Sequence, residues 1–399
     1  MILRLFESIF IKRRDTLFPK GGVMQPVDTA GAVLRIDLDA LAENYRIIQR
    51  QVAPATVAGV VKADGYGLGA DIVAETLMDA GCRHFFVAHL SEAVALKPTL
   101  GQEISLFILN GLQPGAERDC AAIGAIPVLN SLDQLGRWAM LAQERGQSLP
   151  AALQVDSGMS RLGLPPEEVA ILAAEPERLE GIDLRLLMSH LACADHPNAA
   201  FNATQRANFE ALSQHFPGVP RSLANSGGSF LKGRHFDIVR AGIALYGGAP
   251  QEGLHLMRPV VALEARIIQL RSIPTGAGVG YGLTHRCERP TQIATIAVGY
   301  ADGWPRHLSN SGSAFIAGHR APIVGRVSMD SITLDVTDVP DMFLYPGAPV
   351  ELLGPHQTVD QVAADAGTIS YEILTQLGHR YRRDIQRTAA IQHRRSMTA

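Results

Sequence analysis

The chain has 399 residues, of which 47% are apolar and 19% are charged, and its formal net charge is −3. This length suits two domains of ordinary size, and the composition is typical of a soluble globular protein. A balance so close to neutral excludes the basic excess on which binding to nucleic acid or to an anionic membrane depends.

Residues 1–32 are interpreted as an extension or frayed arm in front of the folded domains. No other part of the chain offers the uncharged apolar length that a transmembrane helix needs. The four cysteines are widely spaced and form no CxxC pair, which indicates reduced thiols in a cytoplasmic enzyme. The apolar runs of the extension are interrupted too often for a secretory signal, by Arg4, Glu7, Lys12, Arg13 and Arg14.

Between residues 33 and 257, short apolar runs alternate with amphipathic stretches. Asp39 is predicted to cap a first helix that ends near residue 51. Further helices are predicted over 70–79, 91–97, 131–145, 166–174 and 204–214. Eight apolar runs are predicted to be strands, and they cover 57–61, 85–88, 104–109, 126–129, 152–155, 184–188, 221–223 and 238–240.

Strands that alternate with helices in this way predict an α/β fold with a (β/α)8 barrel of the TIM type over residues 33–257. An open, doubly wound sheet is the alternative, but residues 65–69 match its glycine-rich first turn poorly. From 258 to 399 the apolar runs are no longer separated by helices, which predicts a mostly β domain with a helical tail. Its strands are expected over 260–270, 292–298, 314–316, 331–336 and 350–353, and its helices over 359–366 and 371–377.

Polar side chains follow several of the predicted barrel strands, at the strand ends where such barrels carry their chemistry. The rim would hold a lysine, two arginines, a histidine and two turns that suit an anion, namely Lys62, Arg161, His190, Asn225-Ser226 and Arg240 with Gly242-Ile243. Each also has an ordinary structural explanation. Lys62 can extend from a strand end to solvent, His190 can be structural, the arginines can form ion pairs, and Asn225 can cap a turn.

At these residues the chain resembles the alanine racemase family, barrel-fold enzymes that use pyridoxal phosphate. A single such motif would be weak, whereas an ordered set is specific. The similarity runs from about residue 33 to at least residue 372. The matching segments are VVKADGYGLG (60–69), DSGMSRLG (156–163), SHLA (189–192), ANS (224–226), VRAGIALYG (239–247), GYG (280–282), GYADGWPR (299–306), GRVSMD (325–330) and SYE (370–372).

The resemblance implies racemisation of alanine on a Schiff base between pyridoxal phosphate and Lys62. The freed Lys62 amine would be the base on one face of the substrate, and Tyr281 the base on the other. A phenol is a weak base at neutral pH, with a reference pKa of about 10. His190 and Arg240 would assist it, and Arg240 would also face the pyridine nitrogen and keep it unprotonated.

The resemblance also assigns residues that bind the cofactor and the substrate, and no metal. The cofactor would be held by Tyr66, Asn225, Ser226, Gly242, Ile243 and Tyr371. Arg161 would hold the substrate carboxylate or the phenolic oxygen of the cofactor, and the Met329 amide would be a second carboxylate contact. Tyr300, with Arg306 and Arg326, would narrow the pocket or its entrance.

In the family the tyrosine base comes from the partner subunit, so a head-to-tail homodimer with two shared sites is expected. Three positions depart from the family pattern. Gln154 stands where a carbamylated lysine often orients the arginine; its amide can accept a hydrogen bond from Arg161 but carries no charge. Ser328 replaces a cysteine and Leu68 replaces a histidine.

Three other functions fit parts of this pattern. A broad-specificity or serine racemase would use the same residues in a roomier pocket. A barrel-fold decarboxylase typically has an acid near the pyridine nitrogen and a cysteine in the β domain, whereas this chain has Arg240 and Ser328. A single-barrel carrier of pyridoxal phosphate would explain Lys62 but neither the β domain nor Tyr281.

Overall fold

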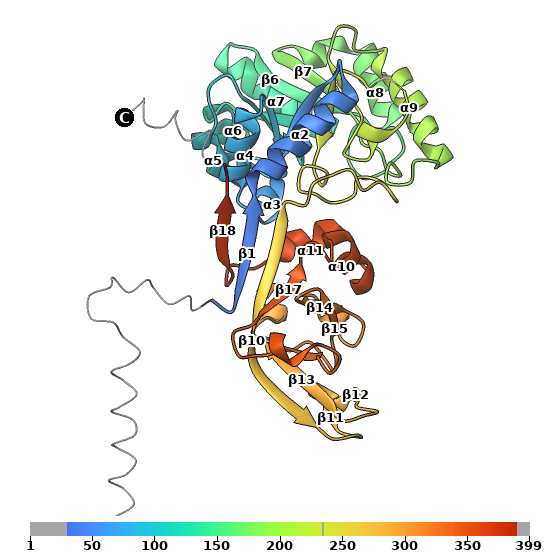
Figure 1. Cartoon of the computed structure of the whole chain (residues 1–399). Coiled ribbons are helices and arrows are strands. Elements are labelled where there is room, and N and C mark those ends of the chain that lie inside the picture. Colours follow the sequence, from blue (N-terminus) through green and yellow to red (C-terminus); the bar gives the residue numbers. More distant parts are fainter. Residues whose placement is uncertain (1–29, 234, 389–399) are drawn as a thin grey trace, which may run out of the picture. The chain divides into compact units, whose positions relative to one another are not determined.

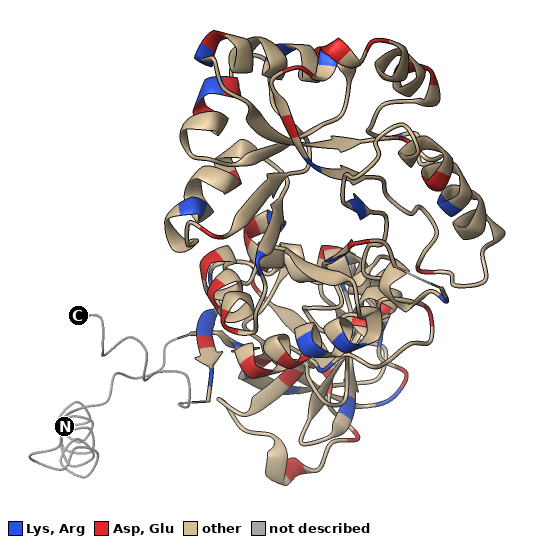
Figure 2. Ribbon diagram, turned by 90° about the horizontal axis from the view of Figure 1, so that it is seen from above, with Lys and Arg blue, Asp and Glu red and all other residues tan. Residues whose placement is uncertain are grey.

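The computed structural model describes residues 30–233 and 235–388. Most of the expected N-terminal extension, residues 1–29, therefore lies outside the described residues. No helix within the described ranges is long and apolar enough to cross a membrane. Figure 2 shows basic and acidic positions interspersed along the ribbon, as the near-neutral composition leads one to expect.

The predicted barrel is confirmed: eight parallel strands pair in the order β8-β7-β6-β5-β4-β3-β2-β9. Between β8 and β9 the ring is bridged by single backbone hydrogen bonds, from Asp237 N to Arg221 O (2.9 Å) and from Arg240 N to Ala224 O (2.9 Å), so it is nearly closed. Each strand overlaps the apolar run predicted for it. The strands are β2 (Thr56–Val60), β3 (His84–Val87), β4 (Ser105–Ile108), β5 (Ile126–Leu129), β6 (Leu149–Gln154), β7 (Ile182–Met188), β8 (Arg221–Ser222) and β9 (Ile238–Ala241).

Helices surround the strands of the barrel (Figure 1). They are α2 (Leu38–Val52), α4 (Ala70–Asp79), α5 (Leu90–Leu96), α6 (Glu117–Ala122), α7 (Leu132–Arg145), α8 (Pro166–Ala174) and α9 (Ala200–Ser213). The cap predicted for α2 was wrong by two residues. The Asp37 side chain accepts the Ala40 amide at 2.8 Å, whereas Asp39 lies in the first turn and accepts the Thr388 amide at 2.8 Å. Helix α6 was not predicted, because its single short turn shows no repeat of apolar positions.

The second sheet is mostly antiparallel and contains β1 (Ala32–Asp37), which the sequence pattern had assigned to the start of the barrel region. Strand β1 pairs antiparallel with β10 and parallel with β18. The other strands are β10 (Val261–Ile273), β13 (Thr291–Ile296), β14 (Ser313–Ile316), β15 (His319–Pro322), β16 (Ile332–Asp335), β17 (Pro349–Leu353) and β18 (Arg382–Gln386). A separate hairpin joins β11 (Gly278–Val279) and β12 (His285–Arg286).

Two predicted helices of this domain are confirmed as α10 (Val359–Ala366) and α11 (Ser370–Gln376). The short 3-10 turns are η1 (Lys97–Thr99), η2 (Pro176–Leu179), η3 (Gly228–Phe230), η4 (Tyr281–Leu283), η5 (Tyr300–Asp302), η6 (Arg306–Leu308) and η7 (Asp341–Phe343). One hydrophobic cluster includes buried residues from both sheets, such as Leu153 of β6 and Leu263 of β10. The two sheets therefore share one continuous apolar interior, with the barrel rim next to α11.

Candidate active site

Lys62 begins a left-handed turn, α3 (Lys62–Tyr66), immediately after the carboxyl end of β2. Ala63, Asp64, Gly65 and Tyr66 all have positive φ angles, between 52° and 61°. For residues with a Cβ, this conformation costs about 1–2 kcal/mol each. Such strain persists only where the surroundings determine the backbone, and it concentrates at functional sites. The sequence motif identified the lysine but not this conformation.

Hydrogen bonds from three elements hold the turn in place. The Glu92 carboxylate of α5 accepts the Ala63 amide at 2.6 Å, and the Asp64 carboxylate accepts the Ala70 amide at 2.8 Å. The Arg383 guanidinium of β18 donates to the Gly67 carbonyl at 2.8 Å. The lysine turn is therefore fixed from α5, from α4 and from the second sheet.

A close approach at Gly67 tightens this arrangement further. Its φ is +84°, and a Cβ atom there would lie 2.6 Å from the Leu374 carbonyl oxygen of α11. A glycine is required at this position on both counts. The contact brings α11 against the lysine turn, so that Tyr371 of α11 reaches the barrel rim of its own chain.

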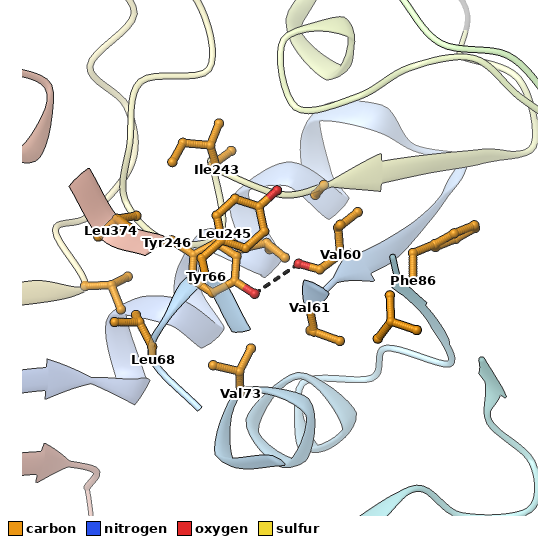
Figure 3. Close-up of a cluster of buried hydrophobic side chains, with 14 of the residues drawn as sticks. Val60, Val61, Tyr66, Leu68, Val73, Phe86, Ile243, Leu245, Tyr246 and Leu374 are labelled. Atoms are coloured by element: carbon orange, nitrogen blue, oxygen red, sulfur yellow. Dashed lines mark hydrogen bonds between the residues drawn. The ribbon is translucent and has the colours of Figure 1, made fainter. Parts of the chain in front are cut away.

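Three tyrosine rings cluster at the end of the lysine turn. The Tyr66 ring stacks on Tyr246, with centroids 4.3 Å apart, and its centroid lies 5.9 Å from that of Tyr371. Tyr246 in turn donates to the Val60 carbonyl at 3.0 Å, which is the bond drawn in Figure 3. Burial raises the pKa of Tyr66 and raises that of Tyr371 to about 12, so both phenols keep their protons and can donate to an anion.

The loop after β9 forms a cradle of backbone amides opposite these rings. The Ser226 hydroxyl accepts the Gly242 amide at 2.8 Å, and no acceptor for the buried Ile243 amide exists in the described part of the chain. Asn225 is engaged within its own turn, where its side chain accepts the Gly228 amide at 2.9 Å. The Ile243 amide, the Ser226 hydroxyl and the two phenols thus offer hydrogen-bond donors around one small space, which suits a phosphate.

Arg240 is buried on β9, and all its partners are neutral. Its guanidinium donates to Ser222, to the Ser189 carbonyl at 2.6 Å and to His190 Nδ1 at 3.3 Å. Burial lowers the Arg240 pKa to about 9. Burial, with the nearby charges of Arg240, Arg161 and Lys62, lowers the His190 pKa to about 3. Since arginine only donates, His190 is neutral, with Nδ1 accepting and the proton on Nε2.

Arg161 lies on the exposed loop after β6, within electrostatic range of Lys62. The loop is built on Asp156, whose carboxylate accepts three successive amides, from Gly158 to Ser160. Gln154 is buried and donates to the Leu162 carbonyl at 3.1 Å. The Gln154 amide, which stands in place of the family's charged carbamate, therefore bonds the backbone next to Arg161. The expected hydrogen bond from the Arg161 side chain to Gln154 is not formed among the described residues.

The remaining predicted site residues lie on loops of the second domain. Tyr281 is 71% exposed, Tyr300 42% and Met329 52%. Tyr300 and Met329 lie on adjacent loops, joined by backbone hydrogen bonds that include Ala301 N to Met329 O at 3.0 Å. Arg326 lies beside the Tyr281 turn, with its NH1 3.5 Å from where a Cβ on Gly282 would be.

Arg306, in η6, lies on the same side of the chain's division as these loops. In the described ranges, no backbone hydrogen bond links the loops or Arg306 to the barrel rim. The chain thus places its predicted site residues in two groups. The group at the barrel rim consists of Lys62, Tyr66, Arg161, His190, Ser226, Arg240, Gly242, Ile243 and Tyr371. The group on the second domain consists of Tyr281, Tyr300, Arg306, Arg326 and Met329.

Sequence reasoning missed Glu92, Arg383 and Tyr246. The sequence around Glu92 contains a helix-capping pattern, but that pattern does not indicate the contact with Ala63 across 29 residues. Arg383 lies beyond the last segment that carries the family resemblance, residues 370–372, so no motif pointed to it. Within the described residues no group of three His, Cys, Asp or Glu side chains could hold a metal ion.

Comparisons with known proteins agree with this architecture. Residues 36–250 match the model of the alanine racemase N-terminal domain, and residues 260–385 match that of the C-terminal domain. The chain belongs to the alanine racemase family. It is 52% identical over 361 residues to a catabolic alanine racemase of Agrobacterium fabrum, covering 90% of this chain and 93% of that protein. Identity to an alanine racemase of Brucella abortus is 53%, with 89% and 93% covered.

Solved structures give the same answer. A crystal structure of an alanine racemase from Bartonella henselae with covalently bound pyridoxal phosphate superposes with a TM-score of 0.87 at 44% identity, and the match covers 90% of this chain and 100% of that one. The biosynthetic alanine racemase of Pseudomonas aeruginosa gives a TM-score of 0.84 at 34% identity, again over 90% and 100%. The (β/α)8 barrel with a mostly β second domain is the fold of these enzymes.

Proposed function

We propose that this protein is a racemase that interconverts L-alanine and D-alanine with pyridoxal phosphate as its cofactor. The observation that carries the proposal is the placement of Lys62 and a cradle of hydrogen-bond donors on one barrel rim, beside a buried arginine without a carboxylate partner. The amine would anchor the cofactor and the cradle would hold its phosphate. An arginine at this place disfavours the decarboxylase alternative, whose relatives typically have an acid there.

The residues present fit the cofactor. A Cβ atom at Gly242 would lie 2.3 Å from the Tyr66 hydroxyl oxygen, so only glycine leaves this space open. The Ile243 amide and the Ser226 hydroxyl face the same space, and a phosphate there would supply the amide with the acceptor it lacks. When bound, pyridoxal phosphate supplies the electron sink that makes the Cα proton of an amino acid acidic.

Lys62 is suited to hold and return a proton at Cα on one face of the substrate. Burial and the positive charge of Arg161 lower its pKa, while Glu92 opposes them. A lysine whose pKa is lowered toward neutrality is both a better nucleophile and a usable general base at physiological pH. Arg161 would at the same time bind the substrate carboxylate, with the Met329 amide as a second donor.

Tyr281 would serve the opposite face, delivered by a second copy of the chain. The Tyr281 turn and the Tyr300 and Met329 loops are exposed and carry apolar and aromatic surface, as an interface requires. Nε2 of His190, which carries the ring proton, would face the incoming phenol oxygen and stabilise its anion by donation. Tyr300, Arg306 and Arg326 would then border the entrance. The protein is accordingly a homodimer with two shared sites.

The reaction is tested by exchange of the Cα hydrogen in D2O, with chiral analysis of the product for alanine and serine. We expect alanine to be racemised fastest. Tyr281→Phe should abolish inversion but retain exchange at Cα of D-alanine, because Lys62 still serves its own face. Faster turnover of serine would reassign the substrate. If the protein binds pyridoxal phosphate but exchanges no Cα hydrogen, it is a carrier of the cofactor and not a racemase.

The shared site is tested by mixing two inactive variants. After subunit exchange between Lys62→Ala and Tyr281→Phe, half of the dimers are mixed, and each mixed dimer has one intact site and one doubly substituted site. We therefore expect about a quarter of the wild-type activity to return. Absence of any recovery, with mixed dimers present by native mass spectrometry, would contradict a site built from two chains.

The cytoplasm is the compartment that fits this function. All four cysteines are free, and Cys82, Cys120 and Cys287 are buried. Thiols that remain unpaired in the folded chain are typical of a reducing compartment. A D-alanine product in that compartment would be available for cell-wall precursors, the role that family similarity implies.

A further inference from the structure

The Glu92 side chain connects two elements of the barrel rim that are not adjacent in sequence. One oxygen, Oε1, accepts the Ala63 amide at 2.6 Å. The other, Oε2, accepts the amides of Ala88 at 2.6 Å and His89 at 3.0 Å. The first contact lies in the turn that carries Lys62, and the other two lie in the loop between β3 and α5.

We propose that Glu92 is a positioning residue for Lys62: its carboxylate holds the left-handed turn in the conformation that presents the lysine amine at the barrel rim. The inference rests on the proposed function only for the identity of the group that Lys62 anchors. Glu92 has no contact with the reacting atoms and acts through the backbone of the turn.

The alternative explanation, a helix cap and nothing more, accounts for only one of the two oxygens. In a capping box, the third helical residue accepts the amide of the cap residue, which here is the bond from His89. That role leaves Oε1 free, yet Oε1 makes one of the two shortest of these bonds, to Ala63. Ala63 has a φ of 52°, so the bond is made to a backbone position that needs outside support.

The charge of Glu92 also reaches Lys62, where it opposes the lowering of the lysine pKa. The charged groups that influence Lys62 are Arg161 from the loop after β6, which lowers its pKa, and Glu92 from α5, which raises it. Lys62 in turn helps to lower the pKa of His190, after β7. Loss of the carboxylate therefore leaves the lysine amine exposed to the positive charge of Arg161 without the anion that opposes it.

The test compares Glu92→Gln and Glu92→Ala with wild type in the full-length protein. The glutamine amide can accept at one oxygen only, because its NH2 group would oppose the donors on the other side. It can keep the two amides of the β3–α5 loop or the Ala63 amide, but not both. Alanine loses all of these bonds.

Glu117→Gln is the matched control. Glu117 is a buried glutamate that, like Glu92, accepts a backbone amide, from Gly115 at 2.8 Å, and it bonds Arg137 at 2.7 Å. These contacts join α6 to α7 on the outside of the barrel, away from the lysine turn. It therefore reports the cost of losing a buried carboxylate without an effect on Lys62.

Three readouts are used. Amide hydrogen exchange of residues 61–70, with and without pyridoxal phosphate, measures the order of the turn. Absorbance titration measures the affinity for pyridoxal phosphate and the pH at which its lysine-bound form changes colour. Thermal unfolding measures overall stability.

For Glu92→Gln we expect exchange in residues 61–70 to accelerate and the cofactor affinity to fall about tenfold or more, the fold-change of one lost charge-assisted hydrogen bond. The colour change should move to lower pH, because the lost carboxylate favoured the protonated form. Glu92→Ala should show larger changes in the same direction. Glu117→Gln should lower stability without changing the exchange of this segment, the affinity or the colour change.

The proposal is overturned if Glu92→Gln matches wild type in local exchange and in affinity, or if its changes only follow the loss of stability seen in Glu117→Gln. Failure of the proposed function would look different. In that case the wild-type protein would not racemise amino acids, while exchange of residues 61–70 would still report whether Glu92 holds the turn.

Discussion

The Arg240 guanidinium donates to Nδ1 of His190 across 3.3 Å at the barrel rim, where Arg240 is buried and His190 is half-buried. The arrangement places a fixed positive charge beside an imidazole that cannot become positive itself. Burial is the largest reason, and Arg240, Arg161 and Lys62 add to it, so that the pKa of His190 falls to about 3. The ring thus remains a hydrogen-bond donor through Nε2 over the whole physiological range.

A histidine held neutral at this site makes the folded protein sensitive to acid. In the unfolded chain His190 takes up a proton near its ordinary pKa of about 6.5, whereas the folded chain does not until about pH 3. Its contribution to stability is therefore complete above pH 6.5 and declines as the pH falls toward 3. At pH 5 the expected loss is about 2 kcal/mol. Urea unfolding of wild type and His190→Asn at pH 7 and pH 5 measures this directly.

The variant should show a smaller loss of stability between the two pH values, by about that amount. An identical pH dependence in both proteins would mean that His190 is not held neutral by its surroundings. His215→Asn provides a control, since His215 is exposed beyond the end of α9.

Arg161 is expected to tune the reactivity of Lys62. Burial and the Arg161 charge lower the Lys62 pKa, so Arg161→Gln should raise it. Less of the amine is then neutral at a given pH, and the pH midpoint for uptake of pyridoxal phosphate by the cofactor-free protein should move upward. Stopped-flow absorbance over a pH series gives this midpoint. Arg178→Gln, which removes an exposed arginine paired with Glu175, should leave it in place.

A feature of the fold or of the site could be predicted from the sequence where it depends on residues that are close together in the chain. The eight barrel strands and the helices at 70–79 and 166–174 were predicted because short apolar runs and helix periodicity are local signals. The barrel rim was predicted with them, since the chemistry of such folds lies at the strand ends.

What the sequence did not indicate depends on contacts between distant segments. Strand β1 lies in the second sheet, where it pairs with β10 and β18. Both partners are more than 200 residues away in the chain, so no local pattern indicated this pairing. The left-handed turn after Lys62 follows from bonds to Glu92 and Arg383, neither of which is near it in the chain. No pattern of neighbouring residues encodes such partners, although Gly65 and Gly67 do indicate that an unusual backbone is present.

Gly242 is expected to tolerate no side chain. A Cβ atom there would lie 2.3 Å from the Tyr66 hydroxyl oxygen, and the Tyr66 ring is stacked on Tyr246 and cannot withdraw. Such overpacking typically costs about 1–3 kcal/mol. Gly242→Ala should therefore lower the affinity for pyridoxal phosphate at least tenfold, by about 1.4 kcal/mol, as measured by absorbance titration.

Gly136→Ala is the control for this substitution. Gly136 lies inside α7, and no atom outside its helix lies within 4 Å of the added Cβ. This variant should gain about 0.5–1 kcal/mol in stability and bind the cofactor as wild type does. Wild-type affinity in Gly242→Ala would show that the phosphate lies elsewhere.

Gln154 should make the enzyme independent of carbon dioxide. A carboxamide has no basic amine to carry a carbamate, so activity in buffer free of bicarbonate should equal that in buffer with it. Steady-state kinetics in degassed buffer test this. Lower activity that bicarbonate restores would show that another amine is modified.

The Gln154 side chain should instead act by holding the backbone beside Arg161. Its amide donates to the Leu162 carbonyl at 3.1 Å in a buried site. Gln154→Leu leaves that carbonyl unpaired, which costs about 1–3 kcal/mol, and the Arg161 loop should loosen. We expect KM for alanine to rise about fivefold or more, with a smaller change in kcat. The reason is that Arg161 would bind the substrate carboxylate.

Gln357→Leu separates this effect from lost stability. Gln357 is equally buried in the second domain, where its amide donates to the carbonyls of Ser313 at 3.0 Å and Leu352 at 2.9 Å. It should lower the melting temperature and leave KM unchanged. If both variants raise KM alike, the effect belongs to general destabilisation. If only Gln154→Leu raises KM, the neutral Gln154 amide orients Arg161, as the charged carbamate does in the family.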